Sequence, residues 1–154
     1  MEYNDILANH LSNENDGWKQ EGERVVHWVK GLKHNDNGPA VIYADGTKLW
    51  YQNDKIHRDE EPAIIDANGT LSWYQNNKVH RENEPAIITP NGFLHWYKMG
   101  KHHREDGPAI IAPNGSQFYY QNGKLHRIDG PAIEWADGKK EYFSNGIAFS
   151  PDVQ

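Results

Sequence analysis

The sequence has no cysteine. Disulfides therefore cannot stabilise the fold, and thiolate chemistry or a thiolate zinc site is excluded. The chain also lacks an apolar run of about 18 residues, the length that a membrane-spanning helix needs. Its first residues lack the basic start and apolar core of a signal peptide. We therefore expect a soluble protein in the cytoplasm.

The charge is not concentrated in one sign. The net charge of -6 arises from 22 acidic and 16 basic residues that are interspersed along the chain. A basic stripe is the usual mark of a nucleic-acid-binding or membrane-surface protein. We therefore expect no duplex nucleic acid partner and no membrane insertion.

Enzyme motifs are also missing. The sequence contains neither a phosphate-binding G-x-x-x-x-G-K-[ST] loop nor a nucleophile elbow. Acids and histidines are plentiful, but they recur as copies, whereas a catalytic centre needs one place where different groups converge. We expect a protein that is not an enzyme and has no cofactor.

What the sequence does contain is a repeat with a period of 23 residues. A Pro-Ala dipeptide recurs at this spacing, at Pro39, Pro62, Pro85, Pro108 and Pro131. A glycine that follows Asp or Asn keeps step with it, at Gly46, Gly69, Gly92, Gly115 and Gly138. A fixed period between 20 and 50 residues is typical of a repeat architecture.

Aromatic side chains form two further columns of the repeat. One column reads Trp50, Trp73, Trp96, Tyr119, Tyr142 and the next reads Tyr51, Tyr74, Tyr97, Tyr120, Phe143. Adjacent residues of a strand point to opposite faces, so both faces carry a ring in every copy. Something must cover the second face. Either the His-Arg link and the acidic loop fold back over it, with guanidinium groups on the rings, or a partner does.

Each copy reads as one antiparallel hairpin. Residues 62–66 begin with proline, which suits the start of a strand, and Leu71–Gln75 form the returning strand. Asn68-Gly69 predicts a type I′ turn between them. Asn76-Asn77 makes a second turn before the extended link 78–81. Strong turn signals every 8 to 12 residues exclude helix. The fold class is therefore all-β, a repeat array of stacked antiparallel β-hairpins with a short N-terminal helix.

Three regions divide the chain. In residues 1–16, Tyr3, Leu7 and Leu11 share one face of a predicted helix that caps the array; a helix that binds a partner is the alternative. The array covers 17–146, with a half copy at 17–31 and full copies from 32 onward. Residues 147–154 form an edge strand and a tail.

The histidine column does not predict a metal site. Two strands per copy advance the array by roughly 10 Å, so equivalent histidines cannot share an ion whose ligands lie about 2 Å away. We expect no metal and assign the His-Arg pairs a structural role in the repeat. These are His57, Arg58, His80, Arg81, His103, Arg104, His126 and Arg127.

The repeat unit W-Y-Q-N-G-K-L-H-R-x-D-G-P-A resembles MORN-like repeats, in the H-R-x-D-G-P-A variant found in bacteriophages and large DNA viruses. The resemblance covers 31–146. It implies single sheets of stacked hairpins that serve as protein-binding scaffolds. It also implies a viral protein that acts in the host cytoplasm and inhibits a host protein, such as a defence factor.

Three functions remain open. The first is a non-enzymatic protein-binding module for a host or cognate protein. The second is an aromatic repeat that binds carbohydrate or nucleotide rings, and the third is a structural homo-oligomer. We interpret the Trp column mainly as core and the Tyr column as the better binding surface. The predicted partner-binding residues are Tyr51, Tyr74, Tyr97, Tyr120, Trp50, Trp73 and Trp96.

Overall fold

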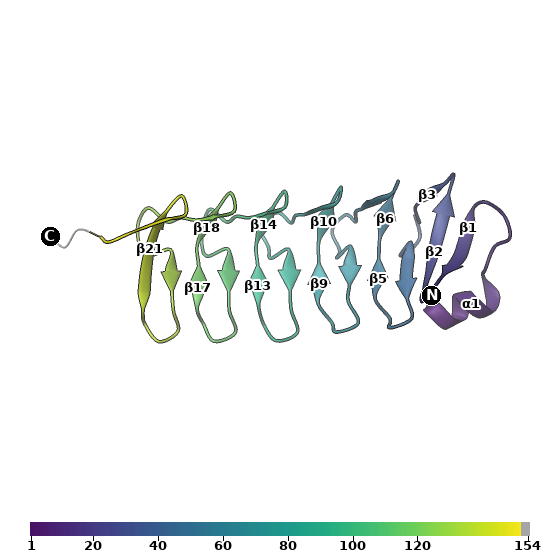
Figure 1. Ribbon diagram of the computed structural model, residues 1–154, viewed down its shortest axis with the longest axis horizontal. Coiled ribbons are helices and arrows are strands. Elements are labelled where there is room, and N and C mark those ends of the chain that lie inside the picture. Colours follow the sequence, from purple (N-terminus) through teal and green to yellow (C-terminus); the bar gives the residue numbers. More distant parts are fainter. Residues whose placement is uncertain (152–154) are drawn as a thin grey trace. The chain divides into compact units, whose positions relative to one another are not determined.

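A computed structural model describes residues 1–151. The chain divides into two compact units, Met1–Lys78 and Val79–Gln154, which we call unit 1 and unit 2. Apart from one short helix, the regular elements of the described residues are strands, and in each unit they form a row of antiparallel hairpins (Figure 1). This confirms the predicted all-β array of stacked hairpins.

Unit 1 contains the helix and the first strands. Its elements are α1 (Tyr3–Asn9), β1 (Gly17–Glu21), β2 (Arg24–Val29), β3 (Leu32–Lys33), β4 (Val41–Tyr43), β5 (Lys48–Leu49), β6 (Tyr51–Gln52), β7 (Lys55–Ile56), β8 (Ile64–Ile65), β9 (Leu71–Ser72) and β10 (Tyr74–Gln75). Strands pair in the order β1-β2-β4-β5-β8-β9. The strand β3 pairs with β2, and β6 pairs with β7 as a separate small hairpin.

Unit 2 repeats this plan. The boundary between the units falls within the strand β11 (Lys78–Val79), because unit 2 begins at Val79. The others are β12 (Ile87–Ile88), β13 (Leu94–His95), β14 (Tyr97–Lys98), β15 (Lys101–His102), β16 (Ile110–Ile111), β17 (Gln117–Phe118), β18 (Tyr120–Gln121), β19 (Lys124–Leu125), β20 (Ile133–Glu134), β21 (Lys140–Ser144) and β22 (Ile147–Phe149). The main sheet runs β12-β13-β16-β17-β20-β21-β22, while β14-β15 and β18-β19 are small hairpins.

The Pro-Ala dipeptide directly precedes the first strand of each main hairpin, as Pro62-Ala63 precedes β8. The alanine is bonded on both sides, since Ala63 N–H donates to Ser72 O at 2.9 Å and Ala63 O accepts from Trp50 N–H at 2.8 Å. The five alanines of this column are fully buried, namely Ala40, Ala63, Ala86, Ala109 and Ala132. Proline precedes them at a position where no ladder N–H is needed.

The main turn of each copy differs from the prediction, whereas the second turn lies at Asn76-Asn77 as predicted. At the main turn only Gly69 has positive φ, at 90°. Gly69 N–H donates to Asp66 O at 2.9 Å and Asp66 N–H donates to Thr70 O at 3.0 Å, which makes a three-residue loop with glycine in its last position. The type I′ prediction for Asn68-Gly69 is therefore wrong. Two successive positive φ values, as type I′ requires, occur instead at Asn76 and Asn77, at 48° and 67°.

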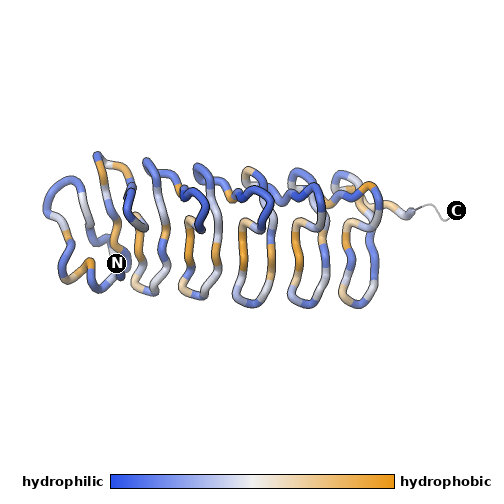
Figure 2. Tube along the Cα trace, turned by 180° about the vertical axis from the view of Figure 1, so that it is seen from behind, coloured by the Kyte–Doolittle hydropathy of each residue, from blue (hydrophilic) through white to orange (hydrophobic). Residues whose placement is uncertain are grey.

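The predicted strand 71–75 is interrupted at Trp73. Leu71–Ser72 belongs to the main sheet, whereas Tyr74–Gln75 belongs to the small hairpin that follows. The same break occurs at Trp50, Trp96 and Tyr119. Each of these copies therefore consists of a main hairpin and a small hairpin that are joined at the aromatic residue, whereas in the last copy β21 continues through Tyr142. Figure 2 shows that apolar residues concentrate in the main hairpins and polar residues in the turns.

The N-terminal helix is shorter than predicted, and Ile6 is its most deeply buried residue. Ile6 is fully buried with Trp18, Val25 and Ile42, while Tyr3 and Leu7 are partly buried against this cluster. Leu11 lies beyond the helix and is exposed. At the other end of the chain, the edge strand β22 is exposed along its length. Residues 152–154 of the predicted tail lie outside the described residues.

Candidate functional site

In several copies an arginine of the same chain stacks on the aromatic residue that joins the main hairpin to the small hairpin. The guanidinium carbon of Arg58 lies 4.1 Å from the centroid of the Trp50 ring, that of Arg104 lies 4.0 Å from Trp96, and that of Arg127 lies 3.9 Å from Tyr119. Stacking of this kind is favourable for a planar cation. We call this arrangement the arginine clasp.

The clasp also holds the loop before each proline. Arg104 Nη1 donates to Pro108 O at 3.2 Å, and Arg127 Nη1 donates to Pro131 O at 3.2 Å. A Cβ on Gly107 would lie 3.1 Å from the guanidinium carbon of Arg104, so glycine allows the arginine to lie flat against the loop. The pattern H-R-x-D-G-P-A thus encodes a loop that folds over the preceding aromatic ring.

The histidine of each link is bonded to the next small turn. His57 Nδ1 accepts from Asn76 N–H at 3.2 Å, and its Nε2 lies 3.2 Å from Asp59 Oδ1. Equivalent bonds join His103 Nδ1 to Asn122 N–H at 3.1 Å and His126 Nδ1 to Asn145 N–H at 3.0 Å. These histidines connect one repeat to the next.

Grooves lie between successive clasp loops. One groove in unit 1 has a volume of about 720 Å³, and one groove in unit 2 has a volume of about 830 Å³. Trp50 and Arg58 line the first and Tyr119 and Arg127 line the second, at equivalent positions of the repeat. The groove in unit 2 has Ile128 at its edge, 92% exposed, where the other copies have an acid.

The opposite face of unit 2 also carries aromatic side chains. Here five rings contact one another in sequence, and we call them the aromatic face. Ring centroids are 5.9 Å apart for Phe93 and His95, 6.4 Å for His95 and Tyr97, 4.0 Å for Tyr97 and His102, and 5.2 Å for His102 and Tyr120.

Apolar side chains of the main sheet extend the aromatic face. Cross-strand pairs share a face, and Ile110 pairs with both His95 and Phe118. The Phe118 ring meets Trp135 edge-on at 5.3 Å, and Trp135 is 37% exposed. A half-exposed surface of aromatic and aliphatic side chains therefore runs across β13, β16 and β17.

Burial also changes the protonation of this face. The pKa of His102 is lowered to about 4, first by burial and second by the neighbouring His95. Burial also lowers the pKa of His95. Both imidazoles are therefore neutral near pH 7.

The predicted partner-binding residues fall into two groups. Trp73 and Trp96 are buried, at 7% and 8% exposure, and Trp50 is half-buried in the groove of unit 1. Trp73 and Trp96 therefore offer little surface to a partner, whereas Trp50 is accessible from the groove. The tyrosines are half-buried and lie in the small hairpins; they are Tyr51, Tyr74, Tyr97 and Tyr120.

Sequence reasoning missed His95, His102, Phe118, Trp135 and Ile128. The signal that could have found them is that none of these residues recurs at its position in another copy. A search for recurring columns passes over such residues.

Within residues 1–151 no group of three or more His, Asp or Glu side chains is placed to hold a metal ion. No helix of the described chain is long and apolar enough to cross a membrane. Comparison with models of known protein families, and with curated proteins, gives no match.

Proposed function

We propose that the protein is a non-enzymatic protein-binding module and that it binds its partner through the aromatic face of unit 2. The observation that carries this proposal is the difference between the two faces. On one face the rings are stacked under arginines, whereas the aromatic face leaves rings and aliphatic side chains half-exposed. Protein interfaces are enriched in aromatic residues and depleted of charge at their centre.

The state of the charged groups supports a binding role over a catalytic one. The clasp arginines are paired with carboxylates of their own loops, as Arg104 is with Asp106 at 3.0 Å. The link histidines are likewise paired, as His57 is with Asp59 at 3.2 Å. Such pairs recur in successive copies and hold the loops, and a reaction needs different groups converging at one place.

The resemblance to MORN-like repeats suggests what kind of partner the protein binds. By that resemblance, the partner is a host or cognate protein, and a viral chain of this type would inhibit a host defence factor. The carbohydrate or nucleotide reading, in which Trp50, Trp73 and Trp96 stack on the ligand, is weakened because Trp73 and Trp96 are buried, although Trp50 is only half-buried.

Affinity capture with mass spectrometry tests the proposal. We expect the wild-type chain to recover one stoichiometric protein, and Trp135→Ala or Tyr97→Ala to lose it. The matched control is Ile128→Ala, which removes an exposed apolar side chain on the groove side. Equal recovery by all variants would contradict the proposed surface, and light scattering that finds a stable dimer would favour a second copy as the partner.

A further inference from the structure

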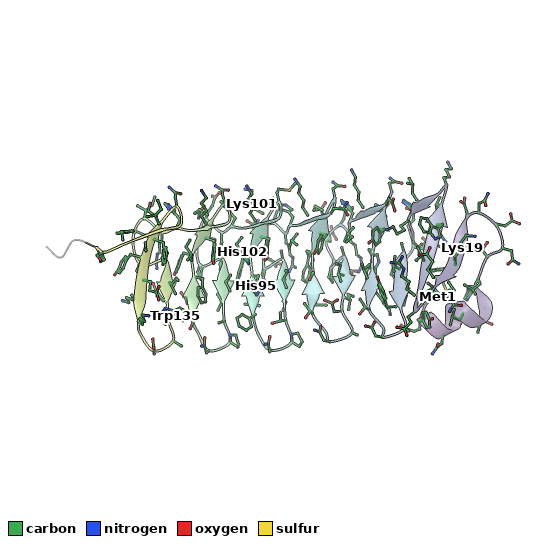
Figure 3. The ribbon with its side chains drawn as sticks, viewed as in Figure 1. Met1, Lys19, His95, Lys101, His102 and Trp135 are labelled. Carbon is green, nitrogen blue, oxygen red and sulfur yellow. The ribbon has the colours of Figure 1, made fainter. Side chains whose placement is uncertain are left out.

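Two histidines of unit 2 meet within the aromatic face. Nδ1 of His95, on β13, lies 3.3 Å from Nε2 of His102, on β15, and the two ring centroids are 5.5 Å apart. Figure 3 shows the two side chains next to each other in the same copy, below Lys101. The small hairpin brings residue 102 back over the main hairpin, which is why residues seven positions apart come into contact.

Neither histidine recurs at its position in the other copies. The position of His95 is occupied by Leu49, Ser72 and Phe118 in other copies, and that of His102 by Ile56, Val79 and Leu125. The repeat therefore needs no imidazole at either position. One copy replaces both contacting side chains with histidine, and a single packing contact does not require two.

The surroundings keep the pair in the form that binds metals. The rings of Tyr97 and Tyr120 lie 4.0 Å and 5.2 Å from that of His102, and Phe93 stacks on His95 at 5.9 Å. Burial by these rings disfavours the charged imidazolium. Neutral imidazole is the commonest metal ligand in proteins, and both side chains remain partly exposed, so an ion from solution can reach them.

The distance between the two nitrogens fits a shared ion. Two imidazole nitrogens at about 2.0–2.1 Å from one tetrahedral ion lie roughly 3.3–3.4 Å apart. The observed separation is 3.3 Å. The two atoms now share one proton. When an ion takes its place, the protonated ring moves that proton to its other nitrogen, so two coordination bonds form and no net proton is released near pH 7.

We propose that His95 and His102 form a two-histidine binding site for a late first-row divalent cation of the Cu²⁺ or Zn²⁺ class. Imidazole suits these ions, and Cu²⁺ binds most tightly in the general affinity order. The two histidine nitrogens supply half of a tetrahedral set, and water supplies the rest. The site is separate from the histidines of the links, such as His57 and His103, which lie near carboxylates.

Calorimetric titration of the full chain with Cu²⁺ or Zn²⁺ alone at pH 7 tests this site. We expect one binding event that raises the thermal midpoint. His95→Leu and His102→Leu should each weaken the metal affinity by at least about tenfold. A loss of that size is already typical when a residue that only supports a metal ligand is changed, and here a ligand itself is removed. Leucine is the residue of other copies at these positions, Leu49 and Leu125, so both variants retain the packing of the repeat.

The control is Asp59→Asn, which removes the carboxylate beside His57 and tests for weak binding at the repeated His–carboxylate pairs. We expect this variant to bind the metal as the wild type does. The proposal is overturned if His95→Leu or His102→Leu binds the metal with wild-type affinity. It is also overturned if the wild type shows no binding event. Because no partner protein is present, the result is separate from that of the affinity capture.

Discussion

Removal of one clasp arginine should destabilise unit 2 measurably. In Arg104→Met the aliphatic stem remains, but the guanidinium that lies 4.0 Å from the Trp96 ring and donates to Pro108 O at 3.2 Å is lost. A partly desolvated cation–π contact contributes about 1–2 kcal/mol and a hydrogen bond from a charged donor contributes about 1.5 kcal/mol. The ion pair with Asp106 adds little, because that carboxylate is 86% exposed.

We therefore expect Arg104→Met to lower the free energy of unfolding by about 2.5–3.5 kcal/mol. Urea unfolding followed by tryptophan fluorescence measures this loss. Arg104→Lys should lose nearly as much, since lysine keeps the charge but not the planar group. The control is Lys101→Met, an exposed lysine of the same copy, with an expected change within about 0.5 kcal/mol. If Arg104→Met matches this control, the clasp does not hold the loop.

Three further changes are expected. Met99→Asn should stabilise unit 2 by about 0.5–1 kcal/mol in urea unfolding, because residue 99 has a φ of 49°, which asparagine adopts more readily than methionine; an unchanged midpoint would count against the turn assignment. The pKa of His102 is lowered to about 4 from 6.5, so the stability of the neutral pair with His95 is complete above about pH 6.5 and is lost as the pH falls toward 4. We expect the free energy of unfolding to fall by about 2 kcal/mol across that window, after discount for partial exposure, and to fall by less in His102→Leu. If the free energy of unfolding of both proteins depended on pH in the same way, the link between His102 protonation and stability would be refuted. Ser116→Ala should cost about 1 kcal/mol, because the buried Ser116 Oγ accepts from Ala136 N–H at 3.0 Å, and amide exchange at residue 136 should accelerate.

The hairpin array could be predicted because every local signal agrees with it. Proline, paired apolar residues and turn residues recur in step, so each copy repeats the same evidence. The geometry of the main turn could not be predicted from Asn68-Gly69 alone. A two-residue and a three-residue loop both accept this dipeptide, and the choice depends on the pairing of Asp66 with Thr70, which is fixed by strand register.

The two faces could be predicted in part. Alternation along a strand predicts that Trp73 and Tyr74 point to opposite faces. The arginine of the His-Arg link was the side chain in the repeat that could cover one of these two faces. The break in the strand at Trp73 was not visible in the pattern, although it separates the buried Trp73 from Tyr74, which lies in the small hairpin. The contact between His95 and His102 was missed because both residues are exceptions to their columns and meet only when the small hairpin folds back.

The most direct test of the central claim uses the absence of cysteine. A single cysteine in place of Ile110, on the aromatic face, or of Ile128, on the groove side, carries one photo-crosslinker at a known position. If unit 2 binds protein through its aromatic face, the label at position 110 will crosslink to one protein and the label at position 128 will not. Crosslinking from position 128 alone, or from neither position, would contradict the account.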